Sequence, residues 1–311
     1  MDTDFLDWAL ADFSGYVAAD ELYDGPFCIL SAVDNRCYKR ILYDVLDHDP
    51  THDDIRTFLR RLHTALSARD LTLLGVTTDG SALSPTPLVE VFGEVPHHIC
   101  TFHIVAEVGK AVLGAVASAR KALAAKQPKL CKGRPSTPAA KQAARTKKRL
   151  AEQRAALFSS RYLFVQRHLN KTERKTLWRV SRGLPQLQAL RAIMEQVYAL
   201  FDRRCRTQTA LAKLAKLRRR VQRFTSLGDT LKKLFAPTLD KALTFLDDRL
   251  LPATSNAVER GNRRYRKRQK HVYRVRTQAQ IGARLALDMW REAQGEGRHQ
   301  TLQTLHEARA G

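Results

Sequence analysis

Cysteine is scarce in this chain: there are five in 311 residues, and no two form a Cys-x-x-Cys pair. An odd number at irregular spacing argues against a secreted disulfide framework. The first residues also lack the order of a signal peptide, in which a basic segment precedes an apolar one. We therefore expect a cytoplasmic protein that folds without disulfides.

Long apolar runs are missing as well. The most apolar long stretch, 103–125, is interrupted by Glu107, Lys110, Arg120 and Lys121. A helix that crosses a bilayer needs about 20 consecutive, mostly apolar residues. The sequence therefore predicts no membrane role.

Acidic residues are outnumbered, with 31 Asp and Glu against 54 Lys and Arg, and the net charge is +23. The imbalance is uneven, because residues 1–60 have a net charge of −8 and residues 61–311 a net charge of +31. A field of this size favours polyanions such as nucleic acid, although it excludes few other partners.

The N-terminal third alternates between strand-like and helix-like patterns. Three apolar runs separated by turn sequences predict an antiparallel meander. A strand, helix, strand order follows and implies parallel pairing. We therefore predict an α/β fold with a mixed five-stranded sheet and flanking helices. The expected strands cover 15–23, 26–33, 37–46, 71–76 and 97–102, and the expected helices cover 53–68 and 87–92.

The middle of the chain carries only helical patterns. Apolar residues recur at spacings of 3 and 4 over 187–201 and 211–224, which predicts antiparallel helices. Glycine and prolines in a basic stretch near 126–154 indicate a loop that either contacts DNA or is a solvated linker. The predicted parts are a core segment 1–103, a helical insertion 104–251, C-terminal core helices 252–295 and a disordered tail 296–311, the core helices lying at 255–270 and 278–293.

Three acidic residues lie in three different settings. Asp20 lies inside an apolar strand-like run, Asp79 follows another such run, and Glu259 lies on a very basic helix. Hard divalent cations prefer oxygen ligands, and Mg²⁺ usually takes one or two protein carboxylates. Two metal ions roughly 3.5 to 4 Å apart suit in-line phosphoryl displacement, so convergence of these carboxylates would form a divided metal site.

These segments resemble the catalytic domain of bacterial insertion-sequence transposases with a DDE triad on a ribonuclease H-like (integrase-like) fold. Asp20 resembles the family's first-strand aspartate, Asp79 its fourth-strand aspartate, and Glu259 its late helical glutamate. Cys100 and His103 resemble a Cys-x-x-His pair found after the second aspartate in groups with a large helical insertion. The insertion lies between Asp79 and Glu259, as in those groups.

The resemblance implies a DNA transposition enzyme that uses two Mg²⁺ or Mn²⁺ ions held by the three carboxylates. It implies that water first frees a 3′ hydroxyl at an element end, which then attacks target DNA without a covalent enzyme intermediate. It further implies a homo-oligomer on DNA in the bacterial cytoplasm, associated with the nucleoid. Cys100, His103 and Asn256 would support the site. At spacings of 3 and 4 along the helix, Glu259 shares a face with Ser255 or Asn256 on one side and with Asn262 or Arg263 on the other.

Each residue also has a structural interpretation. Asp20 and Asp79 could carry an edge-strand charge or cap a turn, and Glu259 could pair with Arg263 at i,i+4. Cys100 and His103 are too few ligands for a structural zinc site. A structure-specific nuclease on the same fold and a non-catalytic DNA-binding remnant of a decayed element therefore stay open as alternatives.

A dense basic cluster surrounds Glu259, and such density is hard to explain without a polyanion. Tyr265 either stacks on a base or packs in the core, and we favour the core; Trp178 and Trp290 are also expected to be core residues. The residues predicted to bind DNA are Arg260, Arg263, Arg264, Arg266, Lys267, Arg268 and Lys270.

One expected feature is missing ahead of Asp20. Related transposases usually carry an upstream helical or zinc-binding module that recognises the element ends, and no such pattern precedes Asp20. We therefore expect a separate upstream DNA-binding module, or a truncated reading frame.

Overall fold

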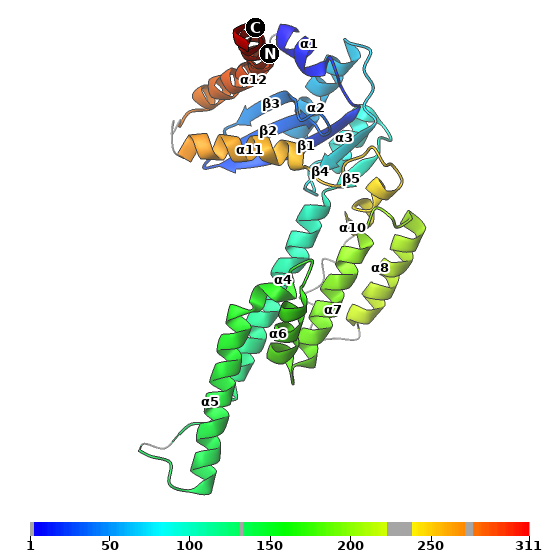
Figure 1. Ribbon diagram of the computed structural model, residues 1–311. Coiled ribbons are helices and arrows are strands. Elements are labelled where there is room, and N and C mark those ends of the chain that lie inside the picture. The colour runs from blue at the N-terminus through cyan, green and yellow to red at the C-terminus, as the bar shows by residue number, and fades with distance from the viewer. Residues whose placement is uncertain (1–2, 131–132, 223–237, 271–275, 311) are drawn as a thin grey trace. The chain divides into compact units, whose positions relative to one another are not determined.

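The computed structural model describes residues 3–130, 133–222, 238–270 and 276–310. Contacts divide the chain into two compact units (Figure 1). The sheet unit comprises Met1–Cys100 and Asp247–Gly311, and the helical unit comprises Thr101–Leu246. The predicted boundaries, 103 and 251, lie close to these.

Five strands form one mixed sheet in the sheet unit, in the order β3-β2-β1-β4-β5. The first three strands pair antiparallel as a meander, whereas β4 pairs parallel to both β1 and β5. The predicted α/β class with a five-stranded mixed sheet is confirmed. The strands are β1 (Tyr16–Asp24), β2 (Phe27–Asp34), β3 (Arg40–Leu46), β4 (Gly75–Thr78) and β5 (His97–Ile99).

The fourth strand begins four residues later than predicted, at Gly75 instead of Leu71. A strand needs a partner, and the partner of Gly75 is Tyr16, where β1 begins. Just before this point the Leu74 amide donates to the Gly15 carbonyl at 2.7 Å. Strand β4 begins where β1 offers it a partner, and it ends at Thr78, directly before Asp79.

Two pairs of helices cover the two faces of the sheet. The helices α2 (His52–Ser67) and α3 (Pro85–Phe92) share an apolar cluster with Val17 of β1. On the opposite face α11 (Asn256–Arg268) and α12 (Gln278–Ala310) cover the sheet, as Figure 1 shows. There Ala18 packs against α11, because successive side chains of a strand point to opposite faces. A short helix, α1 (Thr3–Leu10), packs on α12.

The helical unit has its own apolar core, which includes the fully buried Leu157, Phe164, Leu190 and Val197. Its helices are α4 (Thr101–Ala125), α5 (Pro138–Ser159), η1 (Arg161–Phe164), α6 (Lys171–Ser181), α7 (Pro185–Leu200), α8 (Thr207–Gln222), α10 (Thr238–Lys241) and η3 (Thr244–Leu246).

Among the described helices, α4 is long and apolar enough to cross a membrane by length and composition. Its Val108, Val112 and Val116 are instead buried in the core of the helical unit.

Three expectations differ from the structure. Much of the basic loop near 126–154 is helical, because Thr137 caps α5 and Pro138 occupies its first turn, where proline is tolerated. The tail 296–311, expected to be disordered, is helical as far as Ala310 because α12 continues there. Trp178, expected in the core, is 62% exposed.

The two units differ in charge. The helical unit contains 33 basic and 7 acidic residues, a net charge of +26. The sheet unit contains the other 21 basic and 24 acidic residues, a net charge of −3. The positive charge of the chain therefore resides in the helical unit.

Candidate functional site

Asp20 lies on β1, and Asp79 directly follows β4, the strand that pairs parallel to β1. The last registered pair of these strands is Ala18 with Thr77. Asp20 lies two positions beyond Ala18, and Asp79 lies two positions beyond Thr77, just past the end of β4. Both residues line one pocket of the sheet unit.

The helix α11 follows β1 along its length. Ala18 packs against Ala257 and Val258, and Leu22 against Tyr265. Between these contacts the Asn262 side chain donates a hydrogen bond to Asp20 Oδ2 at 2.6 Å. This bond fixes the Asp20 carboxylate toward α11.

Glu259 lies in the first turn of α11, between the residues that contact Ala18 and the one that contacts Asp20. The Ser255 hydroxyl donates to Glu259 Oε1 at 3.3 Å. A Glu259 carboxylate oxygen also lies within 4.8 Å of Cys100 Sγ. Because Glu259 lies in the first turn of α11, the helix macrodipole favours its negative charge.

The segment that leads into α11 is fastened to the sheet. The Thr77 hydroxyl donates to the Pro252 carbonyl at 3.4 Å, and His98 Nε2 donates to the Ala253 carbonyl at 3.1 Å. The Ser255 amide donates to Cys100 Sγ at 3.4 Å. The side chains of Cys100 and Ser255 are fully buried. Strands β4 and β5 thus fix the position of the helix that carries Glu259.

Asn256, which was also predicted to support the site, is placed differently. Asn256 is exposed at the first position of α11. The side-chain hydrogen bonds to the candidate carboxylates come instead from Ser255, to Glu259, and from Asn262, to Asp20. The spacing of 3 and 4 around Glu259 indicated these two residues as alternatives. His103 lies in the first turn of α4, which belongs to the helical unit.

The adjacent Glu21 was missed by the sequence prediction. It lines the same pocket as Asp20 and Asp79. Burial raises the pKa of the Glu21 carboxyl; a hydrogen bond with Ser81 opposes this rise, and the negative charge of Asp79 adds to it. An acidic residue next to Asp20 in an apolar run was the available signal.

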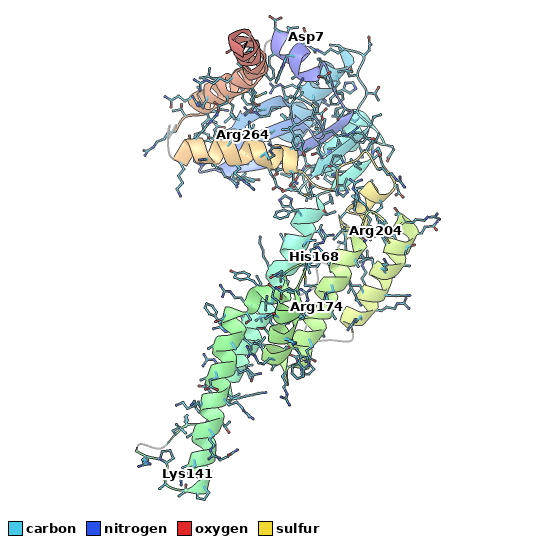
Figure 2. The ribbon with its side chains drawn as sticks, viewed as in Figure 1. Asp7, Lys141, His168, Arg174, Arg204 and Arg264 are labelled. Atoms are coloured by element: carbon cyan, nitrogen blue, oxygen red, sulfur yellow. The ribbon has the colours of Figure 1, made fainter. Side chains whose placement is uncertain are left out.

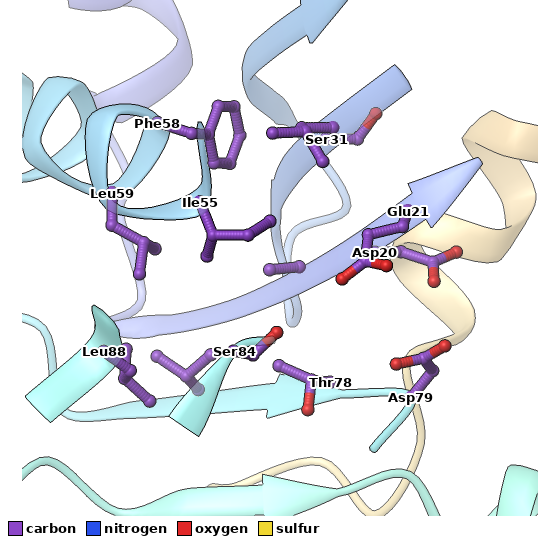
Figure 3. A pocket seen from close by; sticks show the side chains of 13 residues that line it. Asp20, Glu21, Ser31, Ile55, Phe58, Leu59, Thr78, Asp79, Ser84 and Leu88 are labelled. Carbon is purple, nitrogen blue, oxygen red and sulfur yellow. The ribbon is translucent and has the colours of Figure 1, made fainter. Parts of the chain in front are cut away.

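The pocket has a volume of about 30 Å³, roughly enough for two water molecules. Figure 3 shows Asp20, Glu21 and Asp79 at one end of it and Phe58 and Leu88 at the other. Among the described residues, Asp20, Asp79 and Glu259 do not form a group whose oxygens all lie within 4.8 Å of one another. The expected convergence of all three carboxylates is therefore not found at that distance in the described part of the chain, although one or two carboxylates are the usual protein ligands of Mg²⁺.

Two of the predicted DNA-binding cations already have partners on α12. Arg264 forms an ion pair of 2.6 Å with Glu292, and Arg268 pairs with the buried Asp288. Their guanidinium groups thus neutralise α12 carboxylates, and their role in DNA binding stays a prediction.

The other predicted cations differ in their surroundings. Arg260 lies over the Tyr38 ring, 4.9 Å from its centroid. Tyr265 is buried as we favoured, and burial together with its hydrogen bond to Asp24 raises its pKa. The remaining cations are exposed on α11 or just after it: Arg263, Arg266, Lys267 and Lys270.

Comparison with known proteins adds no relative: no family model, no curated protein and no solved structure matches this chain. The candidate site therefore rests on the chain's own residues and their geometry.

Proposed function

We propose that this chain is a metal-dependent DNA strand-transfer enzyme, the catalytic part of a DDE transposase on a ribonuclease H-like fold. One observation carries the proposal. Asp20 on β1 and Asp79 just after the neighbouring parallel strand β4 line one pocket, and the Asn262 bond ties Asp20 to the helix that carries Glu259. A divided carboxylate site would draw its ligands from these three elements.

The sheet supports the fold assignment. An antiparallel meander of three strands followed by two parallel crossover strands is the order that the resemblance implies. The helical unit is inserted between Asp79 and Glu259, as the resemblance also implies.

The proposed chemistry assigns a role to each group. Asp20, Asp79 and Glu259 would hold Mg²⁺ or Mn²⁺, which when bound stabilise the attacking and leaving oxygens of an in-line phosphoryl displacement. Asn262 and Ser255 orient two of the carboxylates through hydrogen bonds. The exposed Arg263 and Lys267 lie one turn or two beyond Glu259 and would contact phosphates.

The same proposal names partners and location. The substrates are element ends and target DNA, and the chain acts as a homo-oligomer on DNA. The protein resides in a bacterial cytoplasm in association with the nucleoid.

Replacement of Asp79 by Asn tests the proposal. With Mg²⁺ or Mn²⁺ and end-containing DNA, the unaltered chain should nick and join, and Asp79→Asn should lose both reactions while still binding DNA. Asp70→Asn is a matched control, since Asp70 is exposed and Asn tolerates its φ of +53°. Activity that persists in Asp79→Asn removes Asp79 from the site. Cleavage without joining favours the nuclease, and inactivity with a partner module and correct ends favours the remnant.

A further inference from the structure

The helical unit contains a broad groove that the proposed metal site does not use. Its volume is about 990 Å³, near the upper end of the range for ligand pockets. The buried Leu123, Leu150 and Val180 belong to its lining. The groove is therefore a concave feature built on the core of the helical unit.

The rim of the groove is strongly basic. Lys126, Arg149, Arg179 and Arg182 line it together with one acid, Glu152, and all five are exposed. None of the four cations forms an ion pair with a carboxylate in the described part of the chain. Four unneutralised cations around one concavity repel each other, and an anionic ligand would relieve that repulsion.

An exposed aromatic ring lies next to this rim. Trp178 is 62% exposed, which is unusual for a large apolar side chain. The Arg182 guanidinium lies 5.7 Å from the Trp178 ring centroid, so one residue links the ring to the groove. A ring beside a basic track is the combination that single-stranded nucleic acid requires, because the bases stack and the phosphates pair with cations.

We infer that this groove binds a single strand of DNA, with its phosphates along Lys126, Arg149, Arg179 and Arg182 and a base on Trp178. The inference rests on the proposed function only in choosing DNA. The location agrees with the charge of the chain, since the helical unit holds a net +26; Lys141, Arg174 and Arg204 are among its basic side chains and are labelled in Figure 2. A duplex would use the same charges but would have no unstacked base for the tryptophan.

The test compares four variants of the full chain by fluorescence anisotropy of a labelled single-stranded oligonucleotide, in EDTA and over a range of salt. Arg179→Ala with Arg182→Ala should flatten the dependence of log affinity on log salt by about 1.4, since each single-strand phosphate contributes about 0.7. Lys216→Ala with Arg219→Ala removes the same charge from exposed positions of α8 outside the groove, and should leave that slope nearly unchanged.

Trp178→Ala should weaken single-strand binding by roughly 5- to 150-fold, whereas Trp178→Phe should retain most of it and duplex affinity should stay unchanged. Equal losses in the groove variant and the α8 control would overturn the inference, because bulk charge would then explain binding. Loss of duplex affinity with normal single-strand affinity would overturn it in favour of a duplex site.

EDTA removes divalent metal ions, so this binding test does not depend on the proposed reaction. If the chain is active and Asp79→Asn abolishes the activity, but the groove variants bind single-stranded DNA normally, only the groove inference is refuted. If the chain is inactive but its single-strand binding depends on the groove residues, only the proposed reaction is refuted.

Discussion

The sheet unit and the helical unit of this chain carry opposite charges. The sheet unit has 24 acidic and 21 basic residues and contains Asp20, Asp79 and Glu259. The helical unit has 7 acidic and 33 basic residues. The three candidate metal ligands thus lie in the unit of low net charge. The proposed attraction for a polyanion would come mainly from the helical unit, whose net charge is +26.

The first prediction tests whether the two units, which have separate apolar cores, also unfold separately. Phe164→Ala removes a fully buried ring from the helical core and should cost about 3–5 kcal/mol. Hydrogen exchange should show lost protection over residues 101–246 and retained protection in the strands β1 to β3. The control Phe102→Ala, at a 55% exposed position of the same unit, should cost less than about 0.5 kcal/mol. Protection lost equally in the strands would show that the two units unfold as one.

A second comparison concerns the contacts that hold the carboxylates. Ser255→Ala and Asn262→Ala each remove a side-chain hydrogen bond to a proposed metal ligand and should lower metal-dependent activity about 10- to 100-fold. The nearby Asn256→Ala should have no such effect, because Asn256 is exposed. The metal concentration that gives half-maximal activity should rise in the first two variants. Equal activity in all three would mean that α11 does not orient the site.

The cations of α11 offer a third comparison, within the sheet unit itself. Arg263→Ala with Lys267→Ala should flatten the salt dependence of duplex binding by at most about 1.8, because each phosphate contact contributes about 0.9. Arg264→Ala with Arg268→Ala should change that slope little, since both guanidinium groups pair with α12. A larger change in the second variant would mean that these ion pairs open on DNA.

The smallest expected effect concerns Glu21. Its pKa is raised in the folded protein, so its ionisation opposes folding once the pH exceeds the pKa of the unfolded chain. Glu21→Gln should therefore stabilise the metal-free protein near pH 7, by less than about 1 kcal/mol because the group is partly exposed, and the gain should vanish near pH 4. Thermal melting in EDTA at both pH values measures this. A variant that is less stable at pH 7 would show that the Ser81 bond outweighs the burial.

Much of the sheet unit was predictable because its information is local. Alternation and turn residues give the strands, and a helix between Leu46 and Gly75 implies the parallel pairing that sets Asp20 beside Asp79. The face of the sheet to which each acidic side chain points is harder to predict from the sequence. Asp20 and Glu21 differ by one position and so point to opposite faces, and only the packing of α11 identifies which face carries Asn262.

Features that depend on distant residues could not be predicted. Arg264 and Glu292 are 28 positions apart, and no pattern around Arg264 distinguishes it from Arg263. Trp178 lies on a helix with an apolar face, yet its position on the outside of α6 follows from how that helix packs. The basic groove likewise joins residues of α4, α5 and α6, which are far apart in the sequence.

The most direct test of the central claim is an anomalous-scattering map of crystals grown with Mn²⁺. The proposed site predicts a peak that contacts the carboxylates of both Asp20 and Asp79 in the unaltered protein and is lost in Asp79→Asn. A map with no peak at these two residues, or with the same peak in Asp79→Asn, would contradict the account.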